Sequence, residues 1–482
     1  MSSRPASVPT WLAGTALGLA FDRWTLALAL AMTGVWIASP WLLVSRGRGW
    51  RAVPLSLLGW SWIAFGLAFV VRFWVLSIDA VTYGDLSERL LLIPPAVVDQ
   101  ALLLGTLYWA AVLLAYRFGG APRLNPLASV GRVVGAGAVS AYDALAVLAG
   151  VAMVLGTDVE LTPPALVRPL ALVGSLWAVA AAAAWFVSLE GGARRRFAVR
   201  RWVYLAPGLV SFVLEPFRER LLLMLLIPFL AALFAGRRLR LGVLIVVFVV
   251  FAIASTITVG WYRQVAWDRD DTPASADHLD PDVWLKEPYY APWTAVLRRF
   301  HSFDSLVFYA YLVPDVVPFD ADRNPILDLL LEGFVPRALY PDKPESRRAM
   351  LFSVTLWSYG DAGRSEANIA PSMAGDLYGV GGWGWVVLGG AGWGALLGVL
   401  DRWRQRLPAG GQAVVVPVLA LLAAGGIERD FARAAATLIQ STIVLIGTAI
   451  VLRRALGAGR GTLTGVHPPP PGEWSREPAP AP

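Results

Sequence analysis

The chain has 482 residues, of which 57% are apolar and only 16% are charged, and its mean hydropathy is +0.58. Soluble proteins carry about 25% charged residues, so this composition excludes an ordinary soluble domain. The net charge is +7, and the chain contains no cysteine and three histidines. This composition excludes disulfides and thiolate chemistry, and it does not supply the usual ligands of a structural zinc site.

Long apolar runs recur along the chain, and runs of about 18 residues or more predict an all-α polytopic membrane protein. Because no basic–apolar–cleavage pattern opens the sequence, we expect the first apolar segment to remain as a membrane anchor. The short runs at 203–214 and 221–235 are either two spans or two half-helices around a break at 215–217. The predicted transmembrane helices number about eleven and cover residues 24–44, 53–77, 96–116, 133–155, 166–189, 203–214, 221–235, 241–260, 377–400, 413–426 and 437–452.

Arginine is concentrated in alternate loops between these spans, with three in residues 45–51, five in 193–201, three in 236–240 and three in 401–406. Short loops rich in Lys and Arg stay in the cytoplasm. The long polar insert at 261–375 is on the opposite side and holds 11 Lys and Arg against 17 Asp and Glu. We therefore expect a multi-pass protein of the cytoplasmic (inner) membrane with an extracytoplasmic insert. The positive-inside rule accounts for the excess positive charge, so we expect no nucleic-acid partner.

Four regions are predicted. Residues 1–260 form an N-terminal transmembrane bundle, 261–375 an extracytoplasmic loop or cap, 376–460 the C-terminal transmembrane helices, and 461–482 a disordered, Pro-rich cytoplasmic tail. Apolar residues at helical spacing make the insert partly helical, with helices at 292–311 and 324–339. The second helix lies on the membrane surface, under a lid, or packs within a small cap. The glycines at 375–394 allow close approach of helices.

Several cationic side chains are candidates for binding a phosphate group. Arg218 and Arg220 lie in the sequence EPFRER at the predicted helix break, where they either clamp a phosphate or pair with the neighbouring glutamates. Prolines fix the backbone around Arg337 and Lys343. The full set of candidates for binding a pyrophosphate is Arg218, Arg220, Arg263, Arg299, Arg337 and Lys343.

Three other residues are candidates for catalytic proton transfer: Asp376, Glu366 and His301. A general base must reach the attacking hydroxyl and titrate near the working pH. We favour the two carboxylates, because they flank the point where the insert meets the next span. Asp143 lies within a predicted span and is either a hydrogen-bond partner in packing or a proton relay.

Nucleotide and metal sites are not indicated. The sequence contains neither a Gly-rich phosphate loop ending in Lys-Ser/Thr nor a dinucleotide fingerprint, and the insert offers no convincing set of oxygen ligands for a metal ion. We therefore expect no cofactor and no metal. A donor that is already activated as a lipid pyrophosphate fits these residues, since such a leaving group needs only cationic stabilisation.

Three segments carry a resemblance to a known family. The turn VPRALYPDKP at 335–344, the segment RFHSFDSL at 299–306 and the segment PSMAGDLYGVGGWG at 371–384 resemble the corresponding parts of bacterial O-antigen polymerases and related oligosaccharide repeat unit polymerases. Arg218 or Arg220 occupies the place of the family's arginine after a mid-chain span, although the Glu-Pro-Phe context departs from the small residues usual there. The resemblance covers about residues 203–400.

This resemblance implies a metal-independent glycosyltransferase that uses undecaprenyl-pyrophosphate-linked oligosaccharide at the outer face of the membrane. The growing chain would pass from one lipid carrier to the next repeat unit during synthesis of O-antigen, capsule or exopolysaccharide. Membrane lipid, a flippase and a chain-length regulator are the implied partners. An O-antigen ligase, a transporter or flippase of lipid-linked oligosaccharides, and a non-catalytic assembly partner are the alternatives. A transporter would call for repeated halves, and the sequence shows no internal repeat.

Overall fold

The computed structural model describes most of the apolar regions of the chain and a few short parts of the insert. The described residues are 23–43, 50–82, 93–118, 138–157, 170, 173–190, 194–214, 218–237, 246–247, 249–251, 254, 302–315, 319, 324–335, 372–407 and 409–458.

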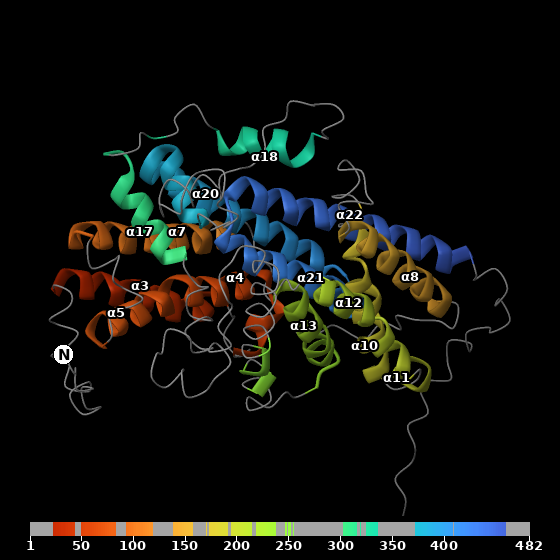
Figure 1. Cartoon of the computed structure of the whole chain (residues 1–482). Helices are drawn as coiled ribbons and strands as arrows, with labels where there is room; N and C mark the ends of the chain where they lie inside the picture. Colours follow the sequence, from red (N-terminus) through yellow and green to blue (C-terminus); the bar gives the residue numbers. More distant parts are fainter. Residues whose placement is uncertain are drawn as a thin grey trace, which may run out of the picture.

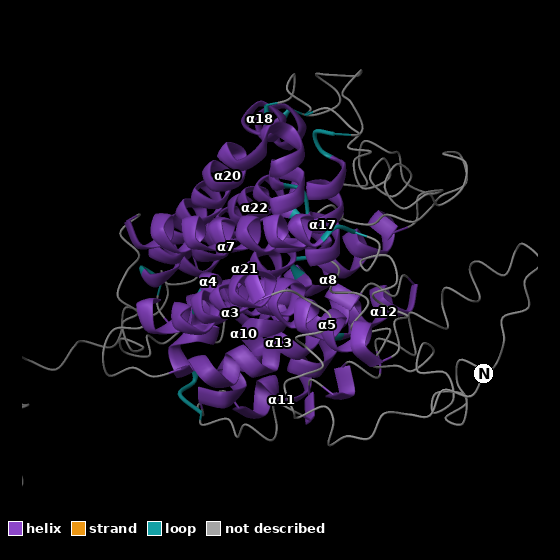
Figure 2. Cartoon of the chain, turned by 90° about the vertical axis from the view of Figure 1, so that its left-hand side faces the viewer, coloured by secondary structure: helices purple, strands orange, loops and turns teal. Residues whose placement is uncertain are grey.

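Every regular element among these residues is helical (Figures 1 and 2). The elements are α3 (Arg23–Leu43), η1 (Trp50–Leu55), α4 (Leu57–Phe65), η2 (Gly66–Val71), α5 (Arg72–Thr82), α7 (Pro95–Phe118), α8 (Ala138–Thr157), α10 (Trp177–Glu190), α11 (Arg194–Val203), α12 (Ala206–Leu214), α13 (Arg218–Phe234), α17 (Ser302–Leu312), α18 (Pro325–Phe334), α20 (Met373–Gln405), α21 (Ala409–Gly425), η5 (Gly426–Glu428) and α22 (Phe431–Ala458).

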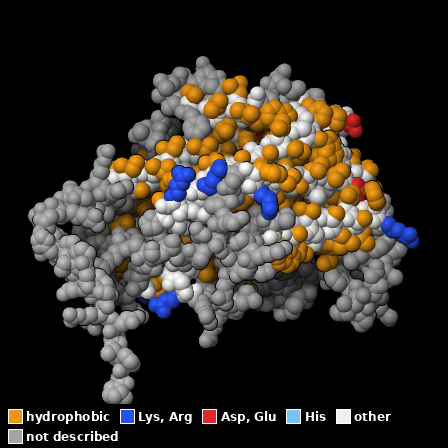
Figure 3. Space-filling model, turned by 180° about the vertical axis from the view of Figure 1, so that it is seen from behind, with side chains coloured by type: hydrophobic (Ala, Val, Ile, Leu, Met, Phe, Trp, Pro, Cys, Tyr) orange, Lys and Arg blue, Asp and Glu red, His pale blue; other side chains and the backbone are white. Residues whose placement is uncertain are grey.

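Six helical stretches of the described part are long and apolar enough to cross a membrane, which makes the chain a multi-pass membrane protein. Figure 3 agrees, because hydrophobic side chains cover much of the described surface on the face it shows. The expected count of about eleven spans stays a prediction, since most of 241–260 lies outside the described residues. The six stretches are Arg23–Trp41, Leu57–Ile78, Pro95–Phe118, Met373–Gln405, Gly411–Glu428 and Phe431–Val451.

Among the described elements, α7 and α20 pack most extensively against each other. Glycines of α20 let its backbone approach α7 closely. An added Cβ would lie 2.7 Å from the Tyr108 carbonyl oxygen at Gly390, and 2.1 Å from the Val112 carbonyl oxygen at Gly394. Only glycine fits such contacts between helix backbones, so the predicted packing role of these glycines is confirmed.

Helix α20 bends near its beginning, at Gly381 and Gly382. Gly382 has a φ of 70°, which is in the region that glycine adopts without steric cost. The bend separates a first segment of α20, residues 373–380, from the long segment that packs along α7. The first segment therefore takes its own direction (Figure 1).

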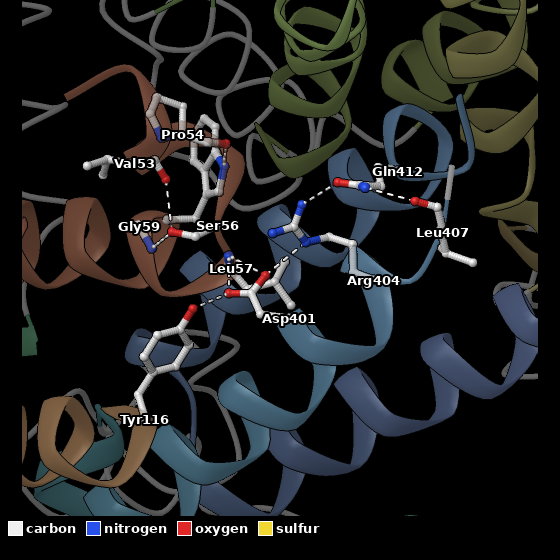
Figure 4. Close-up of polar contacts among 11 residues, drawn as sticks. Val53, Pro54, Ser56, Leu57, Gly59, Tyr116, Asp401, Arg404, Leu407 and Gln412 are labelled. Atoms are coloured by element: carbon white, nitrogen blue, oxygen red, sulfur yellow. Dashed lines mark hydrogen bonds and ion pairs between the residues drawn. The ribbon is translucent and has the colours of Figure 1, made fainter. Parts of the chain in front are cut away.

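A buried polar cluster ties four elements together at one end of α7 and α20, which we call the Asp401 end (Figure 4). The Asp401 carboxylate accepts hydrogen bonds from the Leu57 N–H at 3.0 Å, the Tyr116 hydroxyl at 2.8 Å and the Arg404 Nε at 2.9 Å. Arg404 also donates to Gln412 of α21 at 3.0 Å. Asp401 thus satisfies the first N–H of α4 and fixes the ends of α7, α20 and α21.

The two described helices of the insert pack directly on the spans. Helix α17 packs against η2, α7 and α20, and α18 packs against α22. The expected helix at 292–311 is present as α17 from Ser302, with 292–301 outside the described residues, and the one at 324–339 is present as α18 from Pro325 to Phe334. Part of the insert is therefore an integral part of the helical bundle.

Candidate functional site

A buried ion pair fixes α17 to the bundle. Arg72, at the start of α5, donates from Nε to the Asp304 Oδ1 at 2.9 Å and from Nη2 to Oδ2 at 2.5 Å. The two side chains are only 4% and 5% exposed. Next to them, the rings of Phe73 and Phe303 pack edge to face at 5.5 Å. A fork of two hydrogen bonds sets the orientation of α17 as well as its position.

The Tyr309 ring of α17 lies against the glycine face of the first segment of α20. An added Cβ at Gly375 would lie 2.8 Å from the Tyr309 ring, and one at Gly379 would lie 2.7 Å from it. Side chains at these two positions would push α17 away. We call the end of the bundle where α17 meets α5, α7 and α20 the α17 end.

A chain of polar contacts continues from α7 across α20 to the end of α17. The Gln100 side-chain amide donates to the Tyr378 Oη at 2.6 Å, and the Tyr378 hydroxyl donates to the Val313 carbonyl oxygen at 3.3 Å. The Phe319 ring packs edge-on against Tyr378, with centroids 6.0 Å apart. Tyr378 therefore joins three segments that are far apart in the sequence.

Asp376, the one predicted catalytic residue with a described side chain, lies at this end in the first turn of α20. It is only 2% exposed, and its Oδ2 accepts a hydrogen bond from the Phe431 N–H at 3.3 Å. Asp430 accepts from the Arg433 N–H at 2.8 Å in the same turn of α22. Two carboxylates at a helix N-terminus complement its unpaired N–H groups and its dipole. In this geometry Asp376 holds α20 against α22.

The predicted cationic site is only partly described. Helix α12 ends at Leu214 and α13 begins at Arg218, so the two short helices predicted here are present and separate. Arg220 is half-buried in the first turn of α13, and α13 packs against α10, α12, α21 and η1 rather than chiefly on the elements around α17. Outside the described residues lie Arg263, Arg299, His301, Arg337, Lys343 and Glu366.

Sequence reasoning missed the polar residues that build the α17 end. Arg72 could have been found, because a charged residue inside an apolar run is a functional candidate. Asp304 and Gln100 could not, because their partners lie 232 and 278 residues away in the chain. Asp99 was also missed; its Oδ1 is buried and has no hydrogen-bond partner among the described residues.

Asp143 forms an ion pair at the surface of the bundle. The sequence left two roles possible for this residue, a hydrogen-bond partner in packing and a proton relay. Its Oδ1 accepts from the Arg200 Nε at 3.1 Å, with side chains 42% and 38% exposed, and it also accepts from the Tyr204 hydroxyl. The carboxylate thus joins α8 to the basic helix α11.

Within the described part of the chain, Asp, Glu and His residues form no group of three that could hold a metal ion. The comparisons with protein-family models, with curated proteins and with solved structures each find no match. The functional argument therefore depends on the residues and geometry of this chain.

Proposed function

We propose that the chain is a polymerase of polyprenyl-pyrophosphate-linked oligosaccharide repeat units, acting at the outer face of the cytoplasmic membrane. The observation that carries the proposal is the docking of α17 into the spans by the buried Arg72–Asp304 pair. This pair anchors the insert immediately after Arg299 and His301 in the sequence. A lipid-linked donor presents its pyrophosphate at the boundary between membrane and water. A guanidinium group there can bind two phosphate oxygens at once.

The proposed reaction is a glycosyl transfer. A sugar hydroxyl of the incoming repeat unit attacks the anomeric carbon of the lipid-linked chain, a new C–O bond forms, and the bond to the pyrophosphate oxygen breaks. The hydroxyl proton passes to a carboxylate base, and the lipid pyrophosphate leaves with its negative charge stabilised by arginine. Preorganised donors of this kind commonly account for the largest part of a rate enhancement.

Glu366 and Asp376 are the two proposed general bases. Asp376 also takes part in helix packing, so substitutions of the two residues test different things. Asp376 could accept a proton from a sugar only at a lone pair that its hydrogen bond from the Phe431 N–H leaves open. The change Asp376→Asn would thus affect both the packing of α22 and the reaction. The change Glu366→Gln tests the other proposed base. His301→Ala should retain measurable activity.

The first experiment analyses lipid-linked oligosaccharides in a strain that lacks the protein. Accumulated single repeat units support a polymerase, and accumulated long lipid-linked chains would instead indicate a ligase. Unchanged lipid-linked oligosaccharides would overturn both readings.

Complementation then tests the arginines. Arg337→Ala, and Arg218→Ala together with Arg220→Ala, should lower the polymerisation rate by about 10²–10³-fold, by analogy with the loss of one oxyanion donor. Arg337→Lys should not restore it fully, because an ammonium group lacks the guanidinium fork. Arg406→Ala is the matched control, since Arg406 is exposed at the Asp401 end. Normal polymer from the two arginine variants would contradict the proposed site.

A further inference from the structure

Helix α18 is a short helix within the insert. Asn324 caps it, since its side-chain oxygen accepts from the Ile326 N–H at 2.9 Å and the Leu327 N–H at 3.3 Å, and Pro325 follows at the first helical position. Such a start satisfies N–H groups that a helix end otherwise leaves unpaired. The helix has ten residues and is about 15 Å long.

One side of α18 packs on the bundle. Pro325 is buried, and Leu329 packs against the main hydrophobic core. The partner of α18 is α22, which contains the candidate span Phe431–Val451. In both views of the fold α18 lies at the outer edge of the bundle (Figures 1 and 2), where its neighbour is α22.

The other side of α18 is apolar and exposed. Ile326, Leu327 and Leu330 are 56%, 51% and 53% exposed. Leu330 follows Ile326 by four residues and Leu327 by three, so the three side chains lie within one face of the helix. A helix at the surface of a water-soluble cap normally turns charged and polar residues outward. On α22, Ile443 and Val451 are exposed to a similar extent, at 56% and 65%.

We propose that this face of α18, formed by Ile326, Leu327 and Leu330, contacts the hydrocarbon of the membrane bilayer. Three observations support contact with lipid. The chain is a multi-pass membrane protein, α18 packs along a candidate span, and both helices leave apolar side chains exposed. A helix of about 15 Å reaches through about half of the 30 Å hydrocarbon layer. The insert is therefore not wholly extracytoplasmic, and α18 belongs to the lipid-facing surface.

The absence of native cysteine allows a direct test. Ile326→Cys and Leu330→Cys, each labelled with an environment-sensitive fluorophore, are reconstituted as the full chain into vesicles containing phospholipids with nitroxide-bearing acyl chains. Ile443→Cys serves as the control for a lipid-facing position on α22, and Arg406→Cys as the control for a position in water. Size-exclusion profiles of the labelled proteins check that each variant is folded.

The expected result is strong quenching by the nitroxide lipids at Ile326 and Leu330, similar to that at Ile443, with little quenching by aqueous iodide. Quenching by iodide alone, as at Arg406, would show that the face lies in water and would overturn the proposal. Shielding from both quenchers would show that protein covers the face, and would overturn it equally. The test does not use enzymatic activity, so its outcome is independent of the proposed polymerase function.

Discussion

The buried ion pair between Arg72 and Asp304 should stabilise the docking of α17. Comparing the stability of a single and a double substitution tests this prediction. The change Asp304→Ala leaves a guanidinium that is 4% exposed without the carboxylate that binds it at 2.5 and 2.9 Å. Removing one partner of a buried ion pair costs about 3–5 kcal/mol, because the remaining charge is uncompensated. Replacing both partners by apolar residues of similar size is commonly neutral or stabilising. We therefore expect Asp304→Ala to destabilise the protein strongly and Arg72→Met with Asp304→Leu to recover most of the loss.

Two measurements check this prediction. Thermal unfolding in detergent reports stability, and a disulfide between Tyr309→Cys and Gly375→Cys reports the docking of α17. A Cβ added at Gly375 would lie 2.8 Å from the Cδ2 of Tyr309, a ring atom close to the Tyr309 Cβ, and removing the ring makes room for both new side chains. The disulfide should form in the otherwise unchanged chain, fall sharply with Asp304→Ala, and return in the double variant.

Asp143→Ala is the matched control. Its ion pair with Arg200 has side chains that are 42% and 38% exposed, against 4% and 5% for Arg72 and Asp304, so its loss should cost much less stability. The reasoning would be refuted if Asp304→Ala lost no more stability than Asp143→Ala, or if the double variant were as unstable as Asp304→Ala alone. The first result would mean that the other interactions of Arg72 compensate its charge, and the second that packing alone accounts for the loss.

Two further predictions follow from the packing and from the proposed chemistry. Gly394→Ala places a Cβ 2.1 Å from the Val112 carbonyl oxygen, so thermal unfolding should show a loss of at least the roughly 1–3 kcal/mol typical of overpacking, whereas Gly447→Ala, with nothing within 4 Å, should cost nothing. Polymerisation by the purified protein should survive excess EDTA, because arginine can stabilise the leaving pyrophosphate; activity that is lost on chelation and restored by Mg²⁺ or Mn²⁺ would instead assign the carboxylates as metal ligands.

Most of the described membrane helices could be located from hydropathy. The predicted spans 24–44 and 96–116 correspond to Arg23–Leu43 and Pro95–Phe118 with ends shifted by one or two residues. Hydropathy indicates whether a segment is more stable in lipid or in water, and this preference depends only on the residues of that segment. It failed at the beginning of α20, which extends four residues before the predicted start at 377. Those residues include Asp376, whose charge interrupts the apolar signal but is satisfied by α22.

The candidate site was less predictable, because its polar residues act in pairs from distant segments. Asp376 stood out as a carboxylate at the mouth of a span, yet its hydrogen bond to the Phe431 N–H shows a role in helix packing that the local sequence does not encode. Arg337 and Glu366 lie outside the described residues, so their proposed roles remain predictions. Asp304 gave no signal of its own, since a single acidic residue in the first turn of a helix is common.

By itself, the sequence determined that the chain is helical and crosses the membrane several times, because apolar composition over about 20 residues is sufficient for that conclusion. It also indicated that the glycines of α20 permit close packing, since residues without a side chain allow helix backbones to meet. Only the tertiary structure decided that α17 is tied to the spans through Arg72 and Asp304, and that α18 packs on α22. These contacts join residues far apart in the chain, and their energy depends on shared burial and on geometry, which no local pattern records.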